Sequence, residues 1–210
     1  IARATTGIPV TRIPQATQEL IDHDRFHRLQ VSRAKPVSES AVTSRAATAG
    51  EGFICDGFGK HTAESPVDKA TYQLHAVCSY TSYGYETTVR NHTVDHWVAF
   101  IRYVVLDARA NGHDPKWVRF DRAPELRCDE IKQRCESELS IIVDLTPRRH
   151  HEGVGAAEVN NDMLTRMAEC DLQRRGRGTA WLLPARSYAQ WRLNKRPCGK
   201  YNETREQRYL

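Results

Sequence analysis

The sequence lacks the features that mark membrane proteins, secreted proteins and zinc ribbons. No apolar run approaches the roughly 20 residues that a transmembrane helix needs, and no basic-then-apolar signal segment opens the chain. The six cysteines never form a CxxC pair, so we expect reduced thiols in the nucleus or cytoplasm. The first residue is Ile rather than Met, so we also expect the chain to be a piece of a longer product, such as a polyprotein.

Charge is unevenly distributed along the chain. Residues 162–210 contain 11 Lys and Arg against 5 Asp and Glu, whereas residues 51–161 contain 13 against 17. A basic segment beside an acidic body suits an enzyme that contacts phosphates with one part and binds cations with another. Solvated helix faces with chance asymmetry are the alternative explanation.

Composition divides the chain into three parts. Residues 1–48 are rich in Ser, Thr, Ala and Arg and read as an extension or linker, residues 49–198 as a globular core, and residues 199–210 as a basic tail. His23 and His27 have the i, i+4 spacing that can begin a zinc site. Because no CxxC follows, two surface histidines are the favoured interpretation.

Periodicity predicts the elements of the core. Alternating apolar segments predict strands at 52–59, 72–82, 83–90, 116–121 and 140–147, and three-and-four spacing predicts helices at 93–112, 125–139, 156–175 and 185–196. Three strands before the first helix favour an antiparallel meander, and the later helix-linked strands favour parallel additions. The expected product is an α/β domain with a mixed five-stranded sheet flanked by helices. We expect the four tryptophans to pack in its core.

Three acids occupy informative places in this order of elements. Asp56 lies at the end of the first predicted strand, Asp121 at the end of the fourth, and Glu158 in the first turn of a later helix. Clustered carboxylates repel one another unless cations neutralise them, and Mg²⁺ takes oxygen ligands. Two such ions suit an in-line phosphoryl displacement. Taken singly, each acid has a plainer interpretation, as a surface carboxylate or as a residue that favours the helix dipole.

Longer segments resemble the integrase catalytic core of copia-type LTR retrotransposons, which is related to retroviral integrases. The resemblance spans roughly residues 50–198 and rests on ICDGFG, YQLHAVCSYTSYG, VDHWVAFIRYVV, VRFDRAPEL, GVGAAE with NNDMLTRMAE, and LLPARSYAQWRLNKRP. It assigns the three acids of that family to Asp56, Asp121 and Glu158. Arg122, Ala123 and Pro124 replace the family's usual Asn-Gly-Gly, and the RRHHEGVG loop is longer than usual. Glu152 competes for the third place, but Glu158 is preferred because Ala157 precedes it and an amphipathic helix follows.

The resemblance implies an RNase H-like fold and a metal-dependent polynucleotidyl transferase with two Mg²⁺ or Mn²⁺ ions. Such an enzyme joins 3′ ends of element DNA to target DNA and can also process those ends with water. Double-stranded DNA and further copies of the chain would be its partners, with no membrane involved. Such an enzyme would work in the nucleus and the cytoplasm, and a stage inside a virus-like particle is compatible with this localisation.

Basic residues near the third acid are candidates for DNA contact. They are Arg166, Arg174, Arg175 and Arg177, which lie on or just after the helix that carries Glu158. Arginines so placed would contact phosphates without reading sequence, unless they are ordinary solvated residues. Two other functions stay open, namely an RNase H-like nuclease that only hydrolyses and a non-catalytic remnant that binds nucleic acid.

Overall fold

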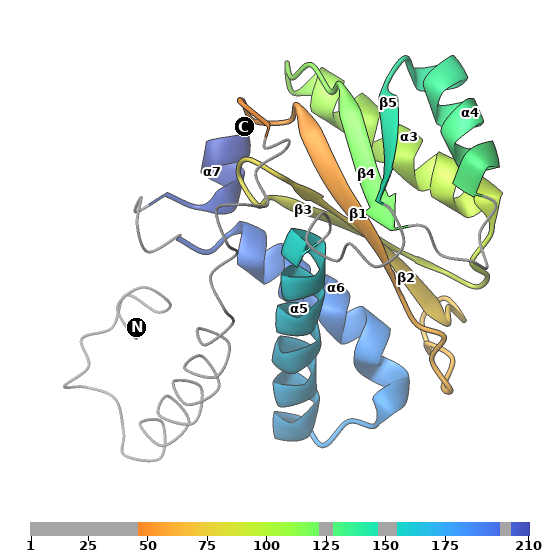
Figure 1. The fold of residues 1–210 in the computed structure, drawn as a ribbon. Coiled ribbons are helices and arrows are strands. Elements are labelled where there is room, and N and C mark those ends of the chain that lie inside the picture. Colours follow the sequence, from red (N-terminus) through yellow and green to blue (C-terminus); the bar gives the residue numbers. More distant parts are fainter. Residues whose placement is uncertain (1–45, 122–127, 147–154, 198–202) are drawn as a thin grey trace. The chain divides into compact units, whose positions relative to one another are not determined.

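A single five-stranded sheet organises the protein, seen in a computed structural model that describes residues 46–121, 128–146, 155–197 and 203–210 (Figure 1). The strands are β1 (Gly52–Phe58), β2 (Tyr72–Cys78), β3 (Gly84–Val89), β4 (Trp117–Asp121) and β5 (Ile142–Thr146). The helices are α3 (Val94–Ala110), α4 (Cys128–Leu139), α5 (Gly155–Arg174), α6 (Leu182–Asn194) and α7 (Arg205–Tyr209), with a 3-10 turn η4 (Thr179–Trp181).

The sheet has the order β3-β2-β1-β4-β5 and is mixed. β1, β2 and β3 form the expected antiparallel meander, and its β2–β3 turn contains Ser82 at a φ of 61°. β4 pairs in parallel with β1, and β5 pairs in parallel with β4. The mixed five-stranded sheet with flanking helices, predicted as an RNase H-like fold, is therefore confirmed.

Helix α3 covers one face of the sheet because its apolar side chains recur on one side. Thr93 caps its N-terminus by accepting a hydrogen bond from the backbone N–H of His96. Trp97, Ile101 and Val105 of this helix are buried in the main core together with strand residues such as Phe53. Full burial of each such side chain contributes roughly 1.5–3 kcal/mol.

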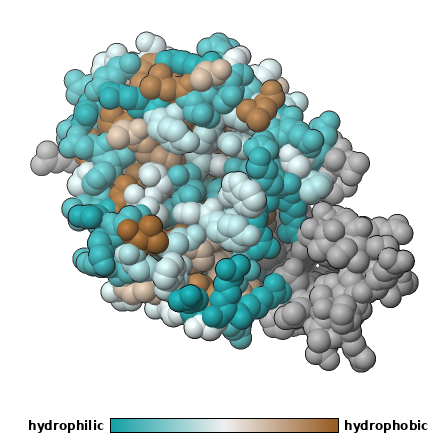
Figure 2. All heavy atoms as spheres, turned by 180° about the vertical axis from the view of Figure 1, so that it is seen from behind, coloured by the Kyte–Doolittle hydropathy of each residue, from teal (hydrophilic) through white to brown (hydrophobic). Residues whose placement is uncertain are grey.

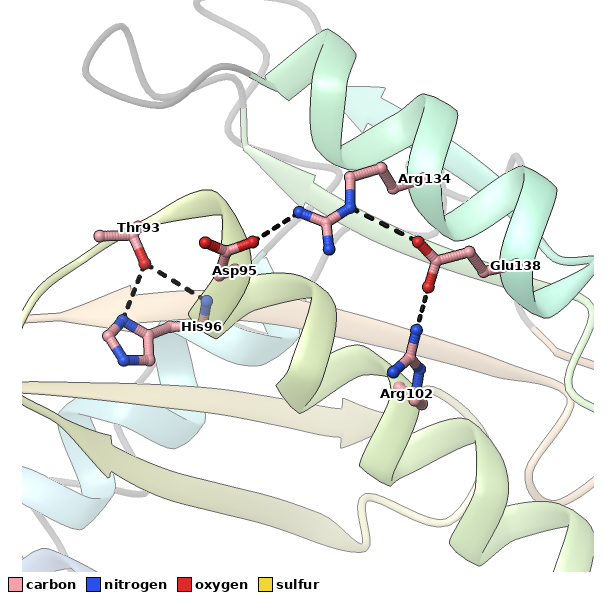
Figure 3. Close-up of polar contacts among 6 residues, drawn as sticks. All are labelled: Thr93, Asp95, His96, Arg102, Arg134 and Glu138. Atoms are coloured by element: carbon pink, nitrogen blue, oxygen red, sulfur yellow. Dashed lines mark hydrogen bonds and ion pairs between the residues drawn. The ribbon is translucent and has the colours of Figure 1, made fainter.

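Ion pairs join helix α4 to helix α3 at the surface (Figure 3). Arg134 of α4 donates to Asp95 Oδ1 at 2.6 Å, and it also lies 3.5 Å from Glu138, which pairs with Arg102 of α3. These side chains are all at least partly exposed, so water screens their attraction. The pairs therefore fix how the two helices lie side by side more than they stabilise the fold.

The opposite face of the sheet carries α5 and α6 and is much more polar. Successive residues of a strand point to opposite faces. Phe53 and Cys55 of β1 belong to the core under α3, whereas Ile54 packs against Ala157 of α5. Buried polar residues gather on this second face, from β2, α5 and α6: Gln73, His75, Asn160, Asn161, Arg186, Gln190 and Asn194. This polar layer turns out to support the candidate site.

The last residues of the chain form the short helix α7, although the sequence suggested only a basic tail. Thr204 caps the helix in a reciprocal arrangement with Gln207. Tyr209 is 1% exposed and stacks on Tyr83 with ring centroids 4.5 Å apart. Residues 203–210 are therefore docked against the domain.

The surface seen from behind is mostly hydrophilic, and its apolar residues are scattered rather than joined into one broad patch (Figure 2). Broad apolar patches usually mark stable protein interfaces. No helix among the described residues combines the length and the apolar character needed to cross a membrane. Described cysteines occur only as free thiols, at Cys55, Cys78, Cys135 and Cys170.

Candidate active site

Asp56 lies in β1 on the face covered by α5, and its side chain is half-buried. Its Oδ1 accepts a hydrogen bond from the backbone N–H of Gly57 at 2.8 Å. Its Oδ2 accepts one from Nδ2 of Asn161, on α5, at 2.6 Å. A carboxylate has about four lone-pair sites, so these two hydrogen bonds orient the group without exhausting its capacity to bind a cation.

Asp121 is the last residue of β4, the strand that runs parallel to β1. Cys55 pairs with Phe120, so the residues that follow them, Asp56 and Asp121, lie at the same level on neighbouring strands. Such strands are roughly 4.8 Å apart. The backbone register thus places the two aspartates at neighbouring positions of the sheet. The side chain of Asp121 lies outside the described part of the structure, so its role as a metal ligand stays a prediction.

Glu158 lies in the first turn of α5 with an exposed side chain. Two neighbours of Glu158 attach this end of the helix to β1: Ala157 packs on Ile54, and Asn161 holds Asp56. The start of α5 is therefore brought to the strand that carries the first acid. Glu152, the competing third acid, lies outside the described residues, so the choice of Glu158 stays a prediction.

A divalent cation fits the chemistry of these donors. Asp56 offers a partly exposed carboxylate, and oxygen atoms are the ligands that Mg²⁺ takes. Asp56, Asp121 and Glu158 are the residues that would hold it. Within the described part of the chain, no three His, Cys, Asp or Glu side chains are grouped to hold a metal. The Asp121 side chain does not belong to that part.

A cleft of about 1040 Å³ opens beside Asp56. Its described lining includes three basic side chains and one stacked aromatic pair, namely Lys60, Lys69, Arg90, Tyr72 and His92. Cations of this kind bind phosphates and aromatic rings stack on bases, so this part of the lining suits a nucleic acid strand. Sequence reasoning missed these residues because they come from three separate segments that carry no shared motif.

The four candidate arginines lie along α5 and after it rather than in its first turn, where Glu158 lies. Arg166 pairs with Asp162 at 2.7 Å, one helical turn away. Arg174 and Arg175 follow at the far end of α5, and Arg174 lies 16 residues beyond Glu158. At 1.5 Å per residue that separation is roughly 24 Å. Any DNA contact of the exposed arginines 174, 175 and 177 is therefore remote from Glu158.

The expectation that all four tryptophans pack in the core is wrong for two of them. Trp97 is buried and Trp117 packs against Ile54 and Ala157, but Trp181 is 38% exposed and Trp191 is 56% exposed. Arg177 lies 5.3 Å from the Trp181 ring, and Tyr188 stacks on Trp191. Both faces of α6 mix polar and apolar residues. Its sequence therefore shows no apolar stripe that would distinguish the buried face from the exposed one.

No family model and no curated protein sequence matches the chain. Solved structures do match it. The simian T-cell lymphotropic virus intasome in complex with PP2A regulatory subunit B56 gamma matches with a TM-score of 0.63 and 16% identity, over 79% of this chain and 56% of that one. This chain thus spans little more than half the length of that protein.

Two structures of the HTLV-2 integrase catalytic core domain in complex with magnesium also match over 79% of this chain and 100% of theirs. The dimeric form gives a TM-score of 0.56 with 16% identity, and the trimeric form gives 0.57 with 15% identity. At such identities the likeness concerns the fold. The chain therefore has the RNase H-like fold of a retroviral integrase catalytic core.

Proposed function

We propose that this chain is the catalytic core of a copia-type retroelement integrase, which joins 3′ ends of element DNA to target DNA. The observation that carries the proposal is the register of β1 and β4, which sets Asp56 and Asp121 at the same level of neighbouring parallel strands. The likeness in fold to viral integrase cores supports the same class of chemistry. Copia-type membership rests on the segments quoted from the sequence.

In the proposed reaction a 3′-hydroxyl of element DNA attacks a target phosphodiester. A new O–P bond forms, the target O3′–P bond breaks, and the target strand leaves with a free 3′-hydroxyl. Water replaces the hydroxyl in end processing. Asp56, Asp121 and Glu158 would hold Mg²⁺ or Mn²⁺, two ions in this proposal, whose charge stabilises the entering and leaving oxygens. No side chain has to form a covalent intermediate.

The cleft beside Asp56 and the remote arginines 174, 175 and 177 would bind the DNA backbone by charge. Phosphate contacts position a duplex without reading its sequence. We also propose that the core acts as a homo-oligomer, is made within a larger polyprotein, and works in the nucleus and cytoplasm. The dimeric, trimeric and intasome forms of the similar structures support the oligomer.

The test uses the full chain and a branched DNA that mimics the joined product. The reverse reaction passes through the same transition state, so resolution of the branch reports the same chemistry. We expect resolution of the branch with Mg²⁺ or Mn²⁺, and loss of it in Asp56→Asn and Glu158→Gln. Glu169→Gln, an exposed acid on the same helix, is the matched control.

Each alternative has its own outcome in this assay. A nuclease of this fold would cut the DNA with water but would rejoin no strand. A non-catalytic remnant would bind the branch and leave it unchanged with either metal. Either result overturns the proposed transferase.

A further inference from the structure

Arg186 is a fully buried cation that pairs directly with no carboxylate among the described residues. It projects from α6 and donates to Gln73 Oε1 at 2.7 Å, to Asn161 Oδ1 at 2.7 Å and to the backbone oxygen of Asn161 at 3.0 Å. It also contacts Thr165, and its guanidinium carbon lies 3.5 Å from the centroid of the Phe58 ring. Its charge needs compensation, because an unpaired buried ion is costly.

Two carboxylates compensate that charge, each through one amide. Asn161 lies between Arg186 and Asp56, and Gln73 lies between Arg186 and Glu86, to which Gln73 donates at 2.6 Å. Burial lowers the pKa of Arg186 to about 10, while Glu86 and Asp56 oppose that shift. The guanidinium therefore stays protonated at neutral pH and is shared between the two acids.

The chemistry of the guanidinium decides which way the Asn161 amide points. Arginine has only N–H donors, so the atom of Asn161 that faces it must be the carbonyl oxygen. The amide nitrogen then faces Asp56 and donates to Oδ2. With the other oxygen held by the backbone of Gly57, both ends of the Asp56 carboxylate are oriented.

We propose that Arg186 is a positioning residue for Asp56 and acts through Asn161. This inference rests on the proposed function, in which Asp56 is a metal ligand. Partners that orient a ligand typically change metal affinity or activity by about 10–100-fold when they are removed. The competing explanation is purely structural, because Arg186 also joins α6 to α5 and β2.

Three single variants of the full chain separate the two explanations. Asn161→Leu removes the link but keeps Arg186, and Arg186→Met replaces the buried charge with an apolar chain of similar length. Thr165→Val is the matched control, because it removes another neutral acceptor of Arg186 that has no hydrogen bond to Asp56. Mn²⁺ affinity is measured by calorimetry without DNA. The rate at saturating branched DNA and the KM for that DNA are measured separately.

We expect Asn161→Leu and Arg186→Met each to weaken Mn²⁺ binding and lower kcat by about 10–100-fold, with KM for DNA within about twofold. The double variant should be no worse than the stronger single one, because both act on one path. Thr165→Val should bind Mn²⁺ within about twofold of the parent even where its melting temperature falls.

The contrary outcomes are distinct. If the parent binds Mn²⁺ and resolves the branch but Asn161→Leu has the same Mn²⁺ affinity as the parent, the positioning role alone is overturned. Additive losses in the double variant overturn the route through Asn161. A parent that binds no Mn²⁺ overturns this inference and the proposed function together. Asn161→Leu retains the arginine, so the test stands even if Arg186→Met fails to fold.

Discussion

The hydroxyl groups of Tyr85 and Tyr209 lie 2.7 Å apart, although 124 residues separate them in the chain. Tyr85 also lies 2.7 Å from Asp107 Oδ2. A phenol has one proton to donate, so Tyr209 donates to Tyr85 while Tyr85 donates to Asp107. This relay joins α7 to β3 and to the last turns of α3, and it makes the end of the chain part of the domain core.

Removing the Tyr209 side chain should therefore destabilise the whole domain. We expect Tyr209→Ala to lower the free energy of unfolding by about 3–5 kcal/mol, as for other buried aromatic rings. Tyr209→Phe should lose only about 0.5–1.5 kcal/mol, because it keeps the ring and removes one hydrogen bond. Urea unfolding followed by fluorescence measures both. Equal midpoints for Tyr209→Ala and the parent would show that α7 contributes nothing to the fold.

Asp121→Asn separates a metal ligand from a structural acid, because it keeps the size of the side chain and removes its charge. We expect strand joining to fall by orders of magnitude, since several kcal/mol of barrier lowering are lost. Thermal stability without metal should stay level or rise, because clustered acids repel one another. Asp144→Asn, which loses the 2.6 Å ion pair with Arg119, is the control and should keep its activity. A strand-joining rate of Asp121→Asn close to that of the parent would contradict the proposed mechanism.

The buried His75 should make the domain less stable in mild acid. Burial lowers its pKa to about 3, with a smaller opposing effect of the hydrogen bond to Gln190. The unfolded chain takes up this proton near pH 6.5, so it binds more protons than the folded chain between about pH 6.5 and 3. Stability then falls as pH falls through that window, by at most about 1.4 kcal/mol per pH unit from this residue.

The matching measurement is urea unfolding of the parent and His75→Gln at several pH values from 4.5 to 7.5. The variant lacks the titrating group, so its deficit relative to the parent should shrink as the pH is lowered. Parallel stability curves for the two proteins would contradict this linkage.

The arginines at the end of α5 and just after it should bind DNA without taking part in the chemistry. Replacing Arg174, Arg175 and Arg177 together by Gln should weaken binding to all sequences alike and flatten the salt dependence by about one unit of slope per lost phosphate contact. At saturating DNA the joining rate should persist, because Arg174 lies roughly 24 Å along α5 from Glu158 and the other two arginines follow it. Replacing Arg102 and Arg134, on the α3–α4 surface, is the control. An unchanged slope of the salt dependence would show that the three arginines are ordinary solvated residues that do not contact DNA phosphates.

Local patterns in the sequence were sufficient for the five strands and the four long helices, and hence for the elements on which Asp56, Asp121 and Glu158 lie. Alternation and helical spacing reflect which side of an element is buried, and that signal lies within each segment. The ends of α3 are local features of the same kind, because Thr93 caps the first turn and Gly112 follows the helix with a φ of 82°. Segment resemblance then supplied an expected fold that the structure confirms.

The polar layer behind Asp56 was decided only by the tertiary structure. Arg186 reaches Gln73 across 113 residues, and Asn161 reaches Asp56 across 105, so no window of sequence contains either pair. An arginine in a helix normally points to water, and only the packing of α6 against α5 and β2 buries this one. The five-residue α7 is likewise too short to be stable alone. It forms because Tyr209 packs against Tyr83 and Tyr85, which lie more than a hundred positions earlier in the chain.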